Sequence, residues 1–386
     1  MSTITASANP TVDGLVEAVT VKLQLPPSLE QQARERAAGV AEWLNSPGTL
    51  LARYAPEIHD QGSMRHGTTV HPKHYTEYDL DLVCLLRLLG ADHLMTPDEL
   101  YELVYRRLHD SPVYRPLLER MNRCIRLVYA NDFHLDILPA RPDWTRGGSC
   151  VLVPDRERRC WKPSNPKGFA EWFDRQATSG GRVLERYLGR VVTASDRLQM
   201  KATLRRVVQL MKRRRDIRFD GDQACARSVV LTTLAGADYD GQLLCTDALV
   251  SVLDAIIDAF GGLIDPPPVP NPTNPDENFA EKWTRKTFAQ FMEFVRVFRH
   301  EMEELLDLHD LEEIHAKLRA MFGEGVATEV VKELGGRMRA AKDQGVLRWA
   351  GPAVALTAAP IAAARTIPAI TFHGDFVCTN PHDRCP

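Results

Sequence analysis

The sequence lacks three features that would place it in a broad functional class at once. Its 386 residues carry a formal net charge of only −3, so it has no general basic field of the kind that non-specific nucleic-acid binders show. None of its eight cysteines forms a Cys-x2-Cys pair, which argues against a zinc site. No secretory signal opens the chain, and its longest apolar stretch, residues 349–364, is Ala-rich, broken by prolines and shorter than the ~20 residues of a membrane span. We therefore expect a cytoplasmic protein that neither enters a membrane nor binds nucleic acid stably.

Two acids stand two residues apart in the apolar segment Tyr78-Asp-Leu-Asp-Leu82. Side chains alternate along a β-strand, so Asp79 and Asp81 are expected on one face and their leucine neighbours on the other. Acids on a packed strand are costly to bury unless a cation neutralises them. Mg²⁺ prefers carboxylate oxygens and often brings phosphates with it, so Asp79 and Asp81 are candidate metal ligands.

Two further segments fit the same chemistry. Gln61-Gly-Ser63 precedes the acids and predicts a turn whose backbone N–H groups and hydroxyl can hold a phosphate. In His134-Leu-Asp-Ile-Leu138, alternation places Asp136 and His134 on one face, and a two-metal site needs such a further carboxylate. His134 is expected to be a hydrogen-bonded neighbour rather than a ligand. Metal ligands beside a phosphate turn indicate phosphoryl or nucleotidyl transfer.

The second half of the chain has helical periodicity. Leu198, Leu204, Val207, Val208 and Met211 follow the spacing of a buried helical stripe. Basic residues at 201–218 accompany it, and such a run is usually a solvated helix face. The Pro/Asn-rich segment 266–275 predicts a long loop.

Taken together, these motifs resemble the cGAS/DncV-like nucleotidyltransferases, or CD-NTases, which are bacterial second-messenger synthases of the polymerase-beta-like superfamily. The resemblance covers roughly residues 28–300. The segments that carry it are Gln61-Gly-Ser-Met-Arg-His-Gly-Thr68, Glu77-Tyr-Asp-Leu-Asp-Leu-Val83, His134-Leu-Asp-Ile-Leu-Pro-Ala140, Trp161-Lys-Pro-Ser-Asn-Pro-Lys167, Leu210-Met-Lys-Arg213, and Asn271-Pro-Thr-Asn-Pro-Asp-Glu-Asn278 with Trp283.

The resemblance implies an α+β fold, with a mixed-sheet catalytic lobe, a helical lobe and the active site in the cleft between them. On this basis we expect a partly ordered N-terminal segment at 1–27, the catalytic lobe with a long N-terminal helix at 28–190, the helical lobe at 191–330 and a peripheral Ala/Pro-rich tail at 331–386. The tail is a hypothetical attachment site for a regulatory partner, and the Asn271–Asn278 loop is expected to brace the helical lobe.

The same resemblance implies the reaction and the residues that carry it. Two Mg²⁺ ions, replaceable by Mn²⁺, and two or more NTPs such as ATP would give a cyclic di- or trinucleotide, which activates a separate effector protein in antiviral (CBASS-type) defence. Among site residues, Asp79, Asp81 and Asp136 match the catalytic, metal-binding acids, Gly62 and Ser63 match the donor-phosphate turn, and Lys212 and Ser228 match residues that reach the triphosphate.

Three assignments stay open at this stage. Gln61 either contacts the donor phosphates or is a buried turn residue, and Ser228 either binds phosphate or only begins a helix. Val229 stands where some relatives carry a base-stacking tyrosine, so base recognition is unassigned.

Two other functions compete with the cyclic-oligonucleotide synthase. One is a template-independent RNA nucleotidyltransferase, against which stand the acidic net charge and the lack of an added RNA-binding module. The other is a catalytically inactive nucleotide-binding sensor, against which stand the three intact acids.

Overall fold

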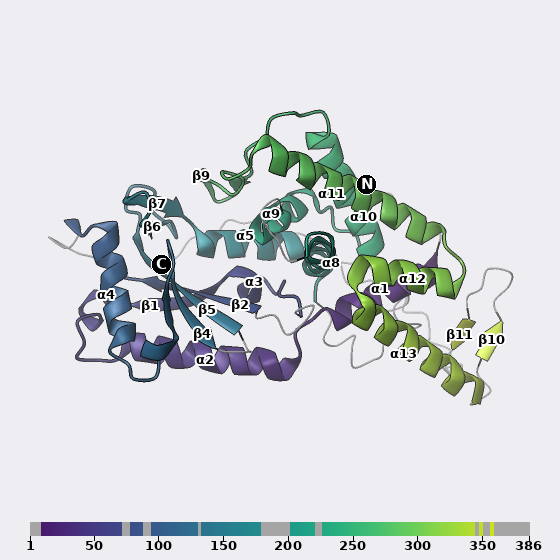
Figure 1. Ribbon diagram of the computed structural model, residues 1–386, viewed down its shortest axis with the longest axis horizontal. Helices are drawn as coiled ribbons and strands as arrows, with labels where there is room; N and C mark the ends of the chain where they lie inside the picture. Colours follow the sequence, from purple (N-terminus) through teal and green to yellow (C-terminus); the bar gives the residue numbers. More distant parts are fainter. Residues whose placement is uncertain are drawn as a thin grey trace, which may run out of the picture.

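The structure, a computed structural model, describes residues 9–71, 78–87, 94–129, 133–178, 201–220, 226–343, 347–349 and 356–358. A lobe built on a β-sheet adjoins a lobe built from helices (Figure 1). The α+β class and the two-lobed arrangement expected from the sequence are therefore confirmed. Most of the expected C-terminal tail lies outside the described residues.

Within the residues that the structure describes, the sheet lobe contains seven strands. They are β1 (Glu57–Gln61), β2 (Tyr78–Leu85), β3 (Leu118–Arg120), β4 (Ile125–Tyr129), β5 (Phe133–Pro142), β6 (Val151–Asp155) and β7 (Cys160–Ser164). The strand order is β1-β2-β5-β4-β3, and β6 and β7 continue from β5. The sheet is mixed because β2 and β5 run parallel, whereas β1 with β2 and β4 with β5 run antiparallel.

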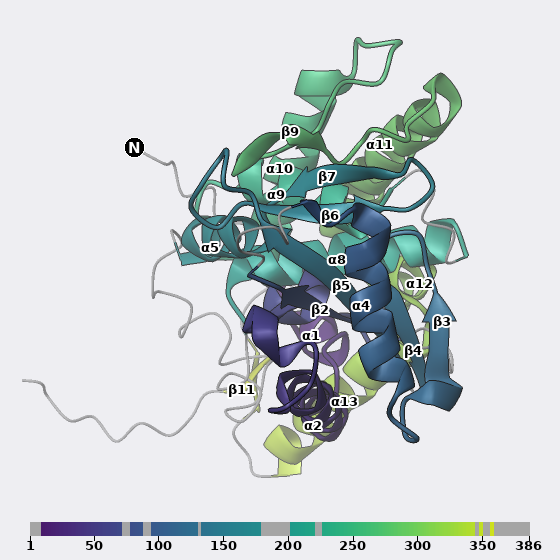
Figure 2. The same ribbon diagram turned by 90° about the vertical axis from the view of Figure 1, so that its left-hand side faces the viewer.

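Helices cover one face of this sheet. They are α2 (Pro27–Asn45) and α4 (Pro97–His109), which pack over the strands (Figure 2). The buried leucines and isoleucines of β2 and β5, such as Leu80, Leu82, Leu135 and Ile137, lie in the same core as these helices. The acids that alternate with those residues consequently point to the other face.

The helical lobe is arranged around α8 (Thr203–Arg218). Its other members are α1 (Pro10–Lys22), α9 (Ser228–Asp238), α10 (Cys245–Phe260), α11 (Arg285–Asp307), α12 (Leu311–Phe322) and α13 (Glu324–Asp343). A short hairpin, β8 (Pro270–Asn271) with β9 (Asn274–Asn278), leads into α11, and α5 (Pro166–Thr178) connects the lobes by contacting both β1 and α8. A small peripheral hairpin, β10 (Leu347–Trp349) with β11 (Leu356–Ala358), follows α13.

The helical lobe includes helices outside the bounds 191–330 expected for it. Within the N-terminal segment, Val12, Leu15 and Val19 of α1 are completely buried in the helical core. Glu17 of α1 forms an ion pair with Arg206 of α8, and both side chains are only 1% exposed. The apolar side chains of α1 are spread around most of its circumference, so the helix is buried only when other helices pack against it on several sides. At the other end, α13 extends an ordered helix beyond residue 331, where the tail was expected to begin.

The basic residues of α8 are also placed differently from the prediction of a solvated face. Arg206, Lys212, Arg213, Arg214 and Arg215 are all buried. Some of these charges are compensated inside the protein. Arg214, for example, donates two 2.7 Å hydrogen bonds to the carboxylate of Glu301 on α11. Helix α8 contacts α1, α5, α9, α10, α11 and α12, so little of its surface remains for solvent. Leu198, expected in the same helix, lies outside the described residues.

Candidate functional site

Strand register brings two of the predicted acids together. Asp81 of β2 pairs with Asp136 of β5 in the parallel ladder, and Asp79 pairs with His134 two residues earlier. Burial along β5 alternates, with Phe133, Leu135 and Ile137 buried and the residues between them partly exposed. The three acids therefore share the face of the sheet that α2 and α4 leave open, as alternation predicts.

The predicted phosphate turn lies against the middle acid. Gln61 pairs with Asp81 across β1 and β2, and the chain then turns at Gly62, which has φ of +66°, into the short helix α3 (Gly62–Arg65). A Cβ atom at Gly62 would lie 2.7 Å from Cγ of Asp81 and would overlap the carboxylate oxygen. Glycine is needed here for both reasons, because only a residue without a side chain allows this backbone to approach Asp81 so closely. Ser63 follows, with its hydroxyl 3.1 Å from that of Thr69.

An arginine of the neighbouring strand compensates the charge of these acids. Arg126 of β4 pairs with Asp136 in the ladder and donates two hydrogen bonds to its carboxylate, at 2.7 and 2.8 Å. The same guanidinium lies 3.7 Å from Asp79, whose side chain is 57% exposed, against 13% for Asp136. Arg126 is a partner that the sequence analysis did not identify, although the β4–β5 register would place it beside Asp136.

Electrostatic strain is concentrated on Asp81. Burial, followed by the nearby Asp136 and Asp79 carboxylates, raises the pKa of Asp81 to about 7. A divalent cation would relieve this repulsion, and carboxylates are the ligands that Mg²⁺ prefers, so the donor set fits such an ion. In the described part of the chain, however, no three His, Cys, Asp or Glu side chains are grouped tightly enough to hold a metal, and Arg126 occupies Asp136. Arg126 therefore competes with a bound cation for Asp136.

The helical lobe contributes the two other predicted residues. Lys212 of α8 lines the same pocket and donates to the carbonyl and hydroxyl of Thr68, at 3.1 and 3.0 Å. Burial, with Arg215 acting in the same direction, lowers the pKa of Lys212 to about 7. Ser228 is the first residue of α9, and its hydroxyl accepts a 2.9 Å hydrogen bond from Arg215. Gln61, Gly62, Ser63, Lys212 and Ser228 all line one pocket with Asp79 and Asp81.

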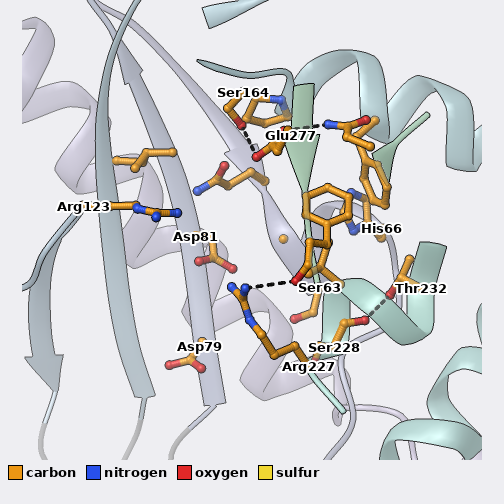
Figure 3. Close-up of a pocket in the computed structure, with 18 of the residues that line it drawn as sticks. Ser63, His66, Asp79, Asp81, Arg123, Ser164, Arg227, Ser228, Thr232 and Glu277 are labelled. Atoms are coloured by element: carbon orange, nitrogen blue, oxygen red, sulfur yellow. Dashed lines mark hydrogen bonds between the residues drawn. The ribbon is translucent and has the colours of Figure 1, made fainter. Parts of the chain in front are cut away.

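This pocket has a volume of about 440 Å³ and is lined from both lobes. Figure 3 shows Asp79 and Asp81 on one side of the pocket and Ser228 and Thr232 of α9 on the other, with Ser63 near Ser228. Arg227 also lines the pocket, a placement that the sequence analysis missed, and its guanidinium donates a 3.4 Å hydrogen bond to the carbonyl of Phe279. In the sequence, the position of Arg227 immediately before Ser228 was the only feature that could have pointed to it as a pocket residue. Arg123 and Lys162 also line the pocket, and both form ion pairs with Glu281.

The Asn-rich hairpin contributes to the pocket as well as to the structure. Asn278 accepts hydrogen bonds from the N–H groups of Val269 and Ala280, which hold the hairpin and the residues next to it together. Glu277 of the same hairpin lines the cavity, and its carboxylate accepts hydrogen bonds from Ser164 at 2.9 Å and Asn271 at 2.8 Å. Burial raises the pKa of Glu277, although those two donated bonds oppose the shift. A carboxylate held in this way was not anticipated from the sequence.

Within the ranges described above, no helix is both long enough and apolar enough to cross a membrane.

Comparison with known proteins gives consistent matches across most of the chain. Residues 20–176 match the Second Messenger Oligonucleotide or Dinucleotide Synthetase domain. A c-di-GMP synthase of Roseivirga ehrenbergii is 32% identical over 290 residues, which are 74% of this chain and 77% of that protein. The cyclic dinucleotide synthase CdnG of Bradyrhizobium diazoefficiens is 28% identical over 397 aligned residues, covering 92% of each chain.

Among solved structures, the CD-NTase CdnG of Bradyrhizobium diazoefficiens in complex with GTP has the same fold. The TM-score is 0.70 at 25% identity, and the match covers 84% of this chain and 98% of the other. The likeness therefore extends over both lobes and not only over the sheet that carries the acids.

Proposed function

Since this chain belongs to the CD-NTase family and is a nucleotidyltransferase that condenses NTPs into a cyclic oligonucleotide, we propose that it joins two GTP molecules into a cyclic dinucleotide in a Mg²⁺-dependent reaction. Support for the number and base of the substrates comes from the relatives, which are named as a c-di-GMP synthase and a cyclic dinucleotide synthase, one of them with bound GTP. An RNA-directed or inactive protein, the alternatives left open by the sequence, has no such support.

One observation carries the proposal: the glycine turn, Asp79 with Asp81, and a lysine of the other lobe all line one cavity. Asp81 is the central residue, with Asp136 beside it in the ladder and the backbone of Gly62 against its carboxylate. Lys212 approaches from α8, so a triphosphate laid along the turn would meet positive charge from the opposite lobe.

The proposed chemistry is an in-line substitution at phosphorus. The ribose hydroxyl of one GTP attacks the α-phosphorus of the other, the new P–O bond forms, and the bond to the β-phosphate breaks to release pyrophosphate. Asp136 accepts the hydroxyl proton, and the turn at Gly62 and Ser63, with Lys212, stabilises the charge on the leaving pyrophosphate. Bound Mg²⁺, held by Asp79, Asp81 and Asp136, would neutralise the triphosphate and acidify the attacking hydroxyl. A second such reaction closes the ring.

The test is product analysis with no RNA present. Purified protein is incubated with GTP and MgCl₂, treated with phosphatase and examined by mass spectrometry. We expect a phosphatase-resistant cyclic dinucleotide that disappears with EDTA and in the variant Asp79→Asn with Asp81→Asn. The matched control is Asp60→Asn, since Asp60 is an exposed acid of the adjacent strand β1 that does not line the pocket. A product that forms only when RNA is added, or that remains linear, would refute the proposal.

For the biological role, we propose that the cyclic product activates a separate effector protein in bacterial antiviral defence within the cytoplasm, as the family resemblance implies. Phage plating on cells that carry the chain with its neighbouring genes tests this. Protection should be lost in the variant Asp79→Asn with Asp81→Asn, and equal protection by both forms would exclude the role.

A further inference from the structure

The pocket has two chemically different ends. Figure 3 shows Asp79 and Ser228 at one end and Glu277 with Ser164 at the other. A triphosphate placed at the acids, the Gly62 turn and Lys212 leaves the Glu277 end for the remainder of the nucleotide, which is the sugar and the base. The apolar lining available to a base consists of Leu138, Phe169, Val229 and Phe279. The Phe279 ring is itself fixed, edge-on to Phe169 at 5.6 Å between centroids.

Glu277 is held in one orientation at that end. Ser164 donates to one carboxylate oxygen at 2.9 Å and Asn271 donates to the other at 2.8 Å. A carboxylate offers about four acceptor sites, and the backbone N–H of Asn165 also acts on this group, so acceptor capacity remains for a ligand beyond these three donors. A glutamate on the surface loses side-chain rotational freedom when it binds a ligand. Glu277 is already held by these donors, so it loses less freedom on binding.

A second carboxylate of the pocket shows the contrast. Glu281 is saturated by cations, because Lys162 and Arg123 both pair with it. Over the described residues, Glu277 forms no ion pair with a cation within 4.0 Å, and the two side chains that donate to it are neutral. The more distant Lys162 ammonium acts on Glu277 as well, but the charge of Glu277 is less fully compensated than that of Glu281.

We propose that Glu277 selects guanine by accepting hydrogen bonds from the N1–H and the 2-amino group of the base. This inference rests on the proposed function, which places a GTP in the pocket, and it adds the residue that sets base choice. Guanine offers two parallel donors on its Watson–Crick edge, which match the two oxygens of a carboxylate. Adenine presents a lone pair at N1 in the same position, and this lone pair faces the carboxylate unfavourably. Pyrimidines offer at most one donor at their ring nitrogen.

The substitution Glu277→Gln tests the proposal because it exchanges one acceptor for a donor. An amide side chain pairs with the donor and acceptor of the adenine edge. Asn271 can still donate to the amide oxygen, and the Ser164 hydroxyl can rotate to accept from the amide nitrogen. The probes are α,β-methylene analogues of GTP, ITP and ATP, which bind without losing pyrophosphate, and equilibrium binding is measured by calorimetry.

In the wild type we expect binding in the order GTP, ITP, ATP analogue, with ITP weaker than GTP by about tenfold because inosine lacks the 2-amino group. Glu277→Gln should lower the ratio of GTP to ATP affinity by about 10- to 100-fold, the discrimination typical of one bidentate contact. The control Asp276→Asn removes a charge from the adjacent residue of β9, which is exposed and pairs with Arg146 outside the pocket, so its ratio should equal that of the wild type.

Two results would overturn the proposal: equal binding of the GTP and ITP analogues by the wild type, which requires no variant to fold, or an unchanged ratio in a folded Glu277→Gln protein. Each of these two results tests base selection and does not test the proposed cyclisation. A wild type that discriminates guanine but releases no cyclic product would instead contradict the proposed function and leave this inference standing.

Discussion

Replacing Gly62 by alanine should reduce turnover by about 100-fold, whereas the same change at Gly48 should leave turnover unchanged. Gly62 has φ of +66°, and Gly48, in the loop after α2, has φ of +77°. An alanine in this left-handed region costs about 1–2 kcal/mol at either position. The two sites differ in what the new methyl group meets: Asp81 at Gly62, and nothing within 4 Å at Gly48.

The contact at Gly62 sets the expected magnitude. A Cβ atom 2.7 Å from Cγ of Asp81 must move away to reach ordinary van der Waals distance, which requires a displacement of about 1 Å in the carboxylate or the turn. A shift of about 1 Å in a reacting group reduces turnover by about 100-fold. The shared backbone penalty should lower the melting temperature of both variants by about 2–8 °C.

The assay combines pyrophosphate release from GTP with thermal unfolding of Gly62→Ala, Gly48→Ala and the wild type. We expect both variants to unfold below the wild type, with Gly62→Ala the lower of the two because of its overlap with Asp81, and only Gly62→Ala to lose turnover. If Gly62→Ala kept more than about a tenth of wild-type turnover, or if Gly48→Ala lost as much, the close approach of the turn to Asp81 would not be what the reaction requires.

Three further predictions concern charged groups. Ionised Asp81 destabilises the folded state, because its raised pKa means that the folded protein binds more protons than the unfolded chain between about pH 4 and pH 7, and stability falls as pH rises through that window. In the metal-free protein at pH 8, Asp81→Asn should therefore raise the free energy of unfolding by an amount on the order of 1–4 kcal/mol, and the melting temperature with it. At pH 4 the substitution should change neither quantity. An equal effect of the substitution at the two pH values would contradict the destabilisation by ionised Asp81. Arg126→Met removes the partner of Asp136, so it should lower the metal-free melting temperature and enlarge the increase produced by MgCl₂; an unchanged increase would show that Arg126 does not compete with a cation. Glu17→Gln leaves Arg206 buried without a counter-charge and should cost about 3–5 kcal/mol in urea unfolding, whereas a cost below about 1 kcal/mol would mean that α1 is dispensable to the helical lobe.

The sequence alone determined the elements whose side chains follow a short-range period. Two-residue alternation in β2 and β5 placed Asp79, Asp81 and Asp136 on one face, and the structure confirms it. Gly62 before Ser63 predicted a turn, and the turn is present with positive φ. These features depend on backbone geometry over a few residues, which local sequence specifies.

Contacts between residues far apart in the sequence became visible only in the tertiary structure. Arg126 and Asp136 meet because β4 and β5 share a register, and Glu277 enters the pocket because its hairpin packs against β7 of the other lobe. Arg206 and Arg214 of α8 are buried with their charges compensated because α1 and α11 supply Glu17 and Glu301 from distant segments. Periodicity states which face of an element is polar but not which element will cover that face, and burial and charge compensation depend on the cover.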